Sequence, residues 1–118
     1  MNENRRAERI DVPLLVEYRP IGASEWQSMT QGKNVSRSGL CFWLKNQIPV
    51  GTKIEVRMSI VENPILQVIA TSRIVWVKAA GVVGQYPFQA GLEFIQVDPE
   101  EISNLLKSAY LYWKEVIL

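Results

Sequence analysis

Two arginines near the start of the chain have the chemistry and the spacing of a ligand-binding pair. Arg5 and Arg9 are four residues apart in the segment Arg-Arg-Ala-Glu-Arg, which also contains Arg6. Residues at this spacing lie on one side of either a helix or an extended strand, so both guanidinium groups can converge on one ligand. Guanidinium binds phosphate bidentately, pairs with O6 and N7 of guanine, and stacks on base planes. The competing interpretation is a solvated arm, because nearby carboxylates balance these arginines.

A second polar segment, Asn34-Val35-Ser36-Arg37-Ser38-Gly39, separates two strand-like stretches. The side chains of Asn34 and Ser36 alternate onto the same face, where they can offer hydrogen-bond donors and acceptors side by side. Gly39 permits either a positive φ or the close approach of another backbone. Asn-Val-Ser also fits a glycosylation acceptor, and the pattern alone is common in ordinary turns. In the context of the arginine pair, we interpret this turn as part of the same binding site.

Composition narrows the classes of function. The 118 residues carry a formal net charge of +1, whereas a general nucleic-acid binder usually has a strong basic excess. The near-neutral charge therefore argues against a barrel that binds single-stranded nucleic acid, and favours a local anion site. The chain has no histidine and one cysteine, Cys41, which argues against histidine-based catalysis and against a metal cluster. We predict a protein that is not an enzyme and that needs no metal or cofactor.

The same features predict the compartment. No apolar run approaches the roughly 20 residues that a membrane span needs. The polar N-terminus is not followed by the apolar segment of a signal peptide. A single cysteine provides no disulfide framework. We therefore expect a cytoplasmic protein with no membrane partner.

The elements that must position these residues are strands. Segments rich in β-branched or aromatic residues, some with alternating polarity, predict strands near 15–18, 26–35, 40–44, 54–58, 67–78 and 88–95. Turn-forming runs such as Pro20–Ser24 and Pro49–Thr52 separate them. The pattern predicts a small antiparallel barrel between about residues 11 and 96. We expect Cys41 in the barrel wall, and we expect the tryptophans in the barrel and helix core rather than as base-stacking platforms: Trp26, Trp43, Trp76 and Trp113.

The period changes at Asp98, where a capping carboxylate is followed by Pro99 and by Glu101 three residues on. This combination predicts a helix from Pro99 to near the C-terminus. Its apolar residues fall on one helical face, which we expect to pack on the barrel. That face consists of Ile102, Leu105, Leu106, Ala109, Trp113 and Val116.

Taken together, the two polar segments resemble the paired signatures of the PilZ domain family: an Arg-x-x-x-Arg arm, then an Asp/Asn-x-Ser-x-x-Gly turn one hairpin later. Pro49–Thr52, Ala90–Phe94 and Asp98–Glu101 resemble later segments of such domains, so the resemblance runs from about Arg5 to Leu106. It implies a PilZ-like split barrel of six antiparallel strands with a C-terminal helix, an all-β fold apart from that helix. It also implies an arm at residues 1–10 and a barrel with its helix at residues 11–118.

The resemblance further implies that this is a receptor for cyclic di-GMP, the second messenger of bacteria. By position, Arg5 and Arg9 would clamp phosphate and guanine, with Arg6 as an additional contact. Asn34 and Ser36 would read a guanine edge, and Gly39 would shape the turn. Such a receptor would change conformation on binding and signal to an unidentified protein partner in motility, adhesion or exopolysaccharide machinery. The resemblance leaves open whether one or two cyclic di-GMP molecules bind, the oligomeric state, and a PilZ-like adaptor that does not bind the nucleotide.

Overall fold

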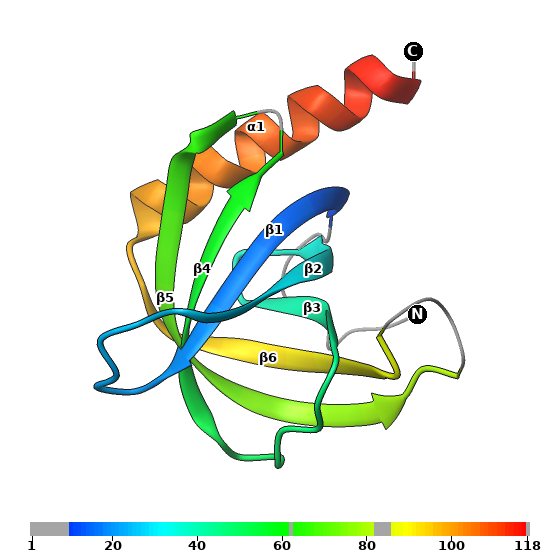
Figure 1. Ribbon diagram of the computed structural model, residues 1–118. Coiled ribbons are helices and arrows are strands. Elements are labelled where there is room, and N and C mark those ends of the chain that lie inside the picture. The colour runs from blue at the N-terminus through cyan, green and yellow to red at the C-terminus, as the bar shows by residue number, and fades with distance from the viewer. Residues whose placement is uncertain (1–9, 62, 82–85, 118) are drawn as a thin grey trace, which may run out of the picture.

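The computed structural model describes residues 10–61, 63–81 and 86–117. Within these ranges the chain forms six β-strands followed by one α-helix (Figure 1). The elements are β1 (Ile10–Pro20), β2 (Gln27–Val35), β3 (Gly39–Leu44), β4 (Lys53–Ile60), β5 (Asn63–Ala79), β6 (Phe88–Val97) and α1 (Pro99–Ile117). The predicted six-stranded barrel with a C-terminal helix is confirmed.

The strands close into one barrel in the order β1-β2-β3-β6-β5-β4, and each neighbouring pair is antiparallel. β1 closes it, because β1 pairs with β2 on one side and with β4 on the other. Leu14, for example, lies opposite both Gly32 of β2 and Ile60 of β4. Closure leaves none of these six strands with a long unpaired edge.

Alternation along the strands separates the core from the outer surface. On β3, the side chains of Leu40, Phe42 and Leu44 are buried in the core, whereas Trp43 between them is only half-buried. The same alternation on β4 buries Val56 and Met58. Burying one such side chain stabilises the fold by about 1.5–3 kcal/mol. The buried side chains of each strand therefore determine which of its faces points outward.

The helix begins as its sequence predicts. Oδ1 of Asp98 accepts hydrogen bonds from the backbone N–H groups of Glu100 and Glu101, at 2.9 and 3.0 Å. This cap satisfies two amide groups that a helix start leaves without intrahelical partners. In Figure 1 the helix lies across one end of the barrel, where it contacts β1, β4 and β5.

The predicted apolar face of the helix packs on the barrel. Ile102, Leu105 and Ala109 are buried in the core, and Leu106 is half-buried against it. Leu105 is therefore the centre of this contact, with Leu106 at its margin. The side chains of Trp113 and Val116 lie outside the described residues.

The expectation that the tryptophans fill the core is wrong for the three whose side chains are described. Trp26, Trp43 and Trp76 do not belong to the core cluster, and Trp76 is 38% exposed. Each stacks near a cationic side chain on the outer surface. The physical reason is that smaller side chains already fill the interior of this narrow barrel, while an indole, with one polar atom, is stable at the boundary with water beside a cation.

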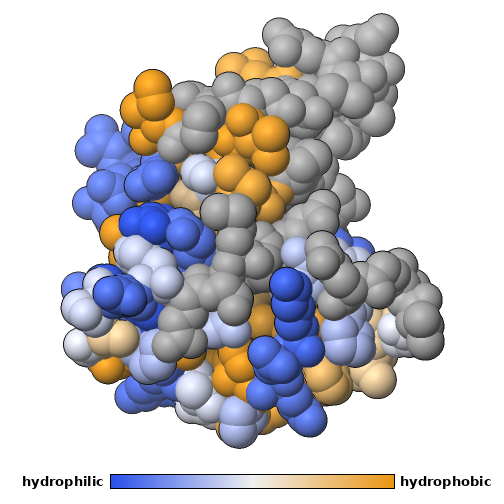
Figure 2. Space-filling model, in the orientation of Figure 1, coloured by the Kyte–Doolittle hydropathy of each residue, from blue (hydrophilic) through white to orange (hydrophobic). Residues whose placement is uncertain are grey.

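The surface in Figure 2 has an apolar area at the end of the barrel that carries the helix, and more polar surface elsewhere on this face. Exposed apolar residues include Val61 and Ile65 on either side of the β4–β5 turn, and Tyr110 and Leu111 on α1. None of these four belongs to the two predicted ligand motifs.

Candidate functional site

The turn between β2 and β3 is built around the hydroxyl of Ser36. This residue is 1% exposed. Its Oγ accepts hydrogen bonds from the backbone N–H groups of Ser38 and Gly39, at 3.2 and 3.3 Å. The backbone N–H of Ser36 donates to the carbonyl oxygen of Gly39 at 2.9 Å. Ser36 therefore sets the shape of the turn, and the side chains on either side of it are those that can face a ligand.

Position 39 requires glycine because the backbone of β6 approaches it closely, and not because of its backbone angles. It is not among the described glycines with positive φ. A Cβ at this position would collide with the carbonyl oxygen of Leu92 on β6. The neighbouring carbonyl of Ser38 accepts a hydrogen bond from the backbone N–H of Phe94, at 2.8 Å. The turn is thus fixed directly on the backbone of β6.

The start of β1 lies beside this turn. Ile10 pairs with Val35, and Asp11 pairs with Asn34, so the chain that follows Arg9 joins the barrel at the second motif. The arginines themselves lie outside the described residues. The start of β1, to which the arm is joined, therefore lies beside the turn. A binding site formed by both motifs requires this proximity.

Asn34 and Arg37 supply side-chain chemistry around the buried Ser36. Asn34 is half-buried on β2, and Arg37 is exposed within the turn. In the part of the chain that the structure describes, Arg37 has no carboxylate partner within ion-pair distance. Arg37 occupies one of the unspecified positions of the Asn-x-Ser-x-x-Gly motif, so the motif did not identify it as a candidate site residue. It adds a cation to the candidate site.

The outer surface beside the turn continues from β2 across three more strands. Asn34 of β2 lies opposite Cys41 of β3, Cys41 opposite Gly91 of β6, and Gly91 opposite Trp76 of β5. Cys41 is a buried cysteine in this row. The next row along the strands is Trp43 of β3, Gln89 of β6 and Lys78 of β5. We call Trp76, Lys78, Gln89 and Gly91 the β5–β6 face.

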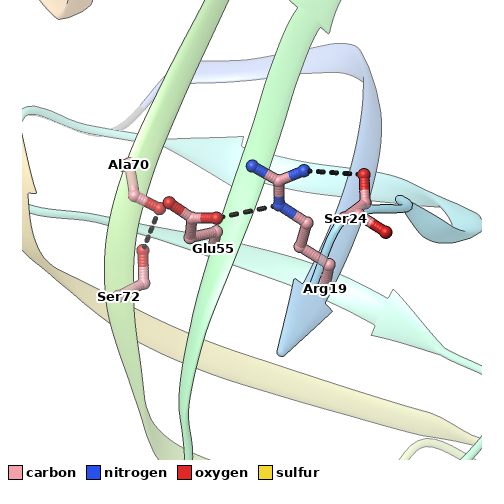
Figure 3. A network of polar contacts seen from close by, with 5 residues as sticks. All are labelled: Arg19, Ser24, Glu55, Ala70 and Ser72. Carbon is pink, nitrogen blue, oxygen red and sulfur yellow. Dashed lines mark hydrogen bonds and ion pairs between the residues drawn. The ribbon is translucent and has the colours of Figure 1, made fainter. Parts of the chain in front are cut away.

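A different arrangement occupies the outer surface of β1 and β4. Nε of Arg19 donates to Oε1 of Glu55 at 2.8 Å, and Nη1 of Arg19 donates to the carbonyl of Ser24 at 3.3 Å, as Figure 3 shows. Nε of Arg57 donates to Oε1 of Glu17, also at 2.8 Å. The side chains that form these two ion pairs, together with Trp26, are called the β1–β4 face.

Trp26 connects the two ion pairs of the β1–β4 face. The Cζ atoms of Arg19 and Arg57 lie 4.1 and 4.5 Å from the centre of its ring. Both guanidinium groups are therefore already bonded to a carboxylate and stacked on an indole. Neither is available to a ligand without losing these contacts.

Two further kinds of feature are absent from the described residues. They contain no group of three or more side chains that could hold a metal ion. No helix among them is both long enough and apolar enough to cross a membrane.

Comparison with known proteins places this geometry in context. A model of the PilZ domain family matches residues 3–111. No curated protein matches the chain significantly. Among solved structures, the chain is similar to the inhibitor of motility of Bacillus subtilis (MotI/DgrA), with a TM-score of 0.76 and 15% identity. That match covers 97% of this chain and 53% of the Bacillus protein, so the chain spans about half the length of that relative.

The chain is also similar to the PilZ domain of YcgR from Escherichia coli, solved with c-di-GMP. This match has a TM-score of 0.70 and 12% identity, and it covers 97% of this chain and 95% of the YcgR domain. At this level of identity, both structures support the fold.

Proposed function

The chain belongs to the PilZ domain family, and on that premise we propose that it is a receptor for cyclic di-GMP that acts by binding and not by catalysis. Its proposed output is a change of conformation that a protein partner detects. The similar Bacillus protein is an inhibitor of motility, which favours motility machinery as the output over adhesion or exopolysaccharide synthesis.

The observation that carries this proposal is the pairing of Ile10 with Val35. It attaches the arginine arm to the barrel beside the Asn34–Gly39 turn. The chain that follows the first motif therefore joins the barrel at the second motif, although a whole hairpin separates the two motifs in the sequence. A dinucleotide, which has two phosphates and two bases, can contact both motifs at once.

The arm supplies the charge in this proposal. Arg5 and Arg9 clamp phosphate and guanine, and Arg6 adds a contact. Charge-assisted hydrogen bonds of this kind contribute about 1.5–3 kcal/mol each. Residues 1–10 act as the ligand-binding arm, and residues 11–118 form the barrel and helix to which the arm is attached.

The turn supplies the specificity. Asn34 reads a guanine edge, Ser36 and Gly39 hold the turn in the required shape, and Arg37 approaches a phosphate. The buried hydroxyl of Ser36 supports a positioning role, since two backbone N–H groups already use its lone pairs. Its hydroxyl lies 3.2 Å from Oγ of Ser38, which can accept the remaining proton.

Binding changes the arm in the proposed mechanism. Ordering a backbone costs about 1–2 kcal/mol per residue, and the arginine contacts offset part of this cost when ligand is present. We expect amides at residues 5–10 to exchange more slowly when cyclic di-GMP is bound. Equal exchange in both states would contradict the closing of the arm even if binding occurs.

Calorimetric titration with cyclic di-GMP tests the proposal, with GTP and cyclic di-AMP as controls. Arg9→Ala and Arg5→Ala should each reduce the affinity at least tenfold, about 1.4 kcal/mol. Arg9→Lys should restore little, because an ammonium group cannot reproduce the bidentate geometry or stack on guanine. A folded wild-type protein that binds no cyclic di-GMP would favour the alternative, an adaptor that acts through protein contacts alone.

A further inference from the structure

Two irregularities interrupt the pairing of β5 with β6. The first inserts Ile95 as an extra residue into β6, opposite the step from Thr71 to Ser72 on β5. The second inserts Val75 as an extra residue into β5. Bulges of this kind re-aim side chains. Both extra residues point outward, since Ile95 is 46% and Val75 is 42% exposed.

An ion pair lies between the two bulges. Arg73 of β5 is directly opposite Glu93 of β6 in the register. Val75 follows Arg73 by two residues on β5, and Ile95 follows Glu93 by two residues on β6. Because the strands are antiparallel, the two apolar side chains lie on opposite sides of the ion pair. We call these four residues, together with the exposed Ile69 of β5, the bulge patch.

The ion pair of the bulge patch is loose. Nη1 of Arg73 lies 3.4 Å from Oε2 of Glu93, and the two side chains are 42% and 50% exposed. A charge-assisted hydrogen bond is normally shorter, and an exposed pair contributes little to stability. Both charged groups can therefore exchange their partner within the chain for one on another molecule at little cost.

We propose that the bulge patch is the interface of a homodimer, formed with a second copy of this chain about a two-fold axis that runs along the strands. This axis places β5 of each copy over β6 of the other. Arg73 then faces Glu93 of the second copy, and the reciprocal pair forms as an isologous contact requires. The same rotation brings Ile95 over Thr71 of the second copy, beside its Ile69.

The charges of the patch favour a second copy as the occupant. One cation and one anion lie side by side, so the patch is complementary to itself after this rotation. A uniformly acidic or basic partner would instead set like charges against either Glu93 or Arg73. The charges also select the direction of the axis, because an axis across the strands would bring Arg73 against Arg73.

Sedimentation equilibrium of the whole chain without nucleotide tests the interface, and its outcome does not depend on the proposed function. The wild type should dimerise as its concentration rises. Ile95→Asp should raise the dissociation constant of the dimer at least tenfold, because it buries a carboxylate against apolar side chains. Ile21→Asp is the matched control, since Ile21 is 53% exposed in the β1–β2 turn, away from the bulge patch. It should dimerise as the wild type does.

Charge reversal separates a contact between copies from the ion pair within one chain. Arg73→Glu and Glu93→Arg should each raise the dissociation constant at least tenfold, because like charges then meet across the axis. An equimolar mixture of the two variants should dimerise, since every acidic side chain then faces a basic one. Each variant should keep the wild-type melting temperature, because both side chains are about half exposed.

Three outcomes would overturn the inference. The first is a wild-type chain that stays monomeric up to about 1 mM. The second is a dimer that Ile95→Asp leaves unchanged. The third is a mixture of the two charge-reversed proteins that dimerises no better than either protein alone.

Discussion

The β1–β4 face and the β5–β6 face both have a tryptophan on the outside of the barrel, but they differ in the partners of their polar groups. On the β1–β4 face, each arginine bonds to a carboxylate and stacks on Trp26. On the β5–β6 face, Lys78 approaches Trp76 without an ion-pair partner among the described residues, and Nε2 of Gln89 lacks an acceptor there. An indole beside a cation is therefore not by itself a sign of a ligand site.

The balance of charge explains this difference. Strands β1 and β4 contain three acidic and three basic residues, so their charges can pair across the strands. The other four strands contain three basic residues and only Glu93 as an acid. A surface whose charges and donors are satisfied within the fold contributes to stability, whereas one with unsatisfied donors can contribute to binding. The comparison predicts that substitutions on the two faces will separate stability from affinity.

The largest effect is expected at Gly39, which fixes the turn on β6. Gly39→Ala places a Cβ against the carbonyl oxygen of Leu92, and backbone atoms cannot turn aside as a side chain can. We expect a loss of unfolding free energy of about 1–3 kcal/mol, together with weaker cyclic di-GMP binding. Urea denaturation and calorimetry measure the two effects.

Gly91→Ala is the matched variant, because its obstacle is the indole of Trp76, which can move. It should cost less stability than Gly39→Ala. Equal stability losses in the two variants would mean that the indole is as rigid as the backbone.

The next prediction is that Ser36 mainly affects stability, whereas Asn34 mainly affects ligand affinity. Ser36→Ala leaves the backbone N–H groups of Ser38 and Gly39 without their acceptor, which should cost about 1–3 kcal/mol of unfolding free energy. Asn34→Ala should mainly reduce the affinity for cyclic di-GMP, by about 0.5–1.5 kcal/mol. Thermal denaturation and calorimetry of both proteins check this separation. A Ser36→Ala protein with wild-type stability and lost binding would instead make Ser36 a direct ligand contact.

Trp26 should affect stability alone. Trp26→Ala removes the ring that stacks on the guanidinium groups of Arg19 and Arg57. At about 0.5–1 kcal/mol for each exposed cation–π contact, the expected loss of unfolding free energy is about 1–2 kcal/mol. Calorimetry should show unchanged affinity for cyclic di-GMP. Weakened binding would break the distinction between the two faces.

The smallest effect is expected for a single ion pair of the β1–β4 face. The side chains of Glu17 and Arg57 are each 26% exposed, so solvent screens their attraction. A double-mutant cycle with Glu17→Gln and Arg57→Gln should give a coupling free energy of about 0.2–1 kcal/mol. High salt should reduce this coupling. A much larger value would mean that Trp26 shields the pair from water.

Local patterns were sufficient to predict the elements of the fold. β-branched residues predicted the long strand that became β5, and Asp98 predicted both the start of α1 and the cap that the structure contains. The sequence left two explanations open for Gly39, positive φ or close approach. The choice depends on Leu92, which is far away in the chain, so only the folded barrel could decide it.

The outer faces could not be predicted, because they depend on the strand register. Arg19 and Glu55 are 36 residues apart, and Arg57 and Glu17 are 40 apart. Trp76 lies opposite Gly91 only because the register shifts between Ile74 and Trp76. The arginines of the arm remain a prediction, since Arg5, Arg6 and Arg9 lie outside the described residues.

The fixing of the turn on β6 has a consequence for the order of folding. The hydrogen bond from the N–H of Phe94 to the carbonyl of Ser38 joins segments that are far apart in the sequence. Contacts between such distant segments form slowly, because a long loop must close before they are made. On the ribosome, the β2–β3 turn emerges early, but its hydrogen bond to β6 can form only after β6 has also emerged. The nascent chain should therefore gain affinity for cyclic di-GMP late, when most of the barrel has been synthesised and closed.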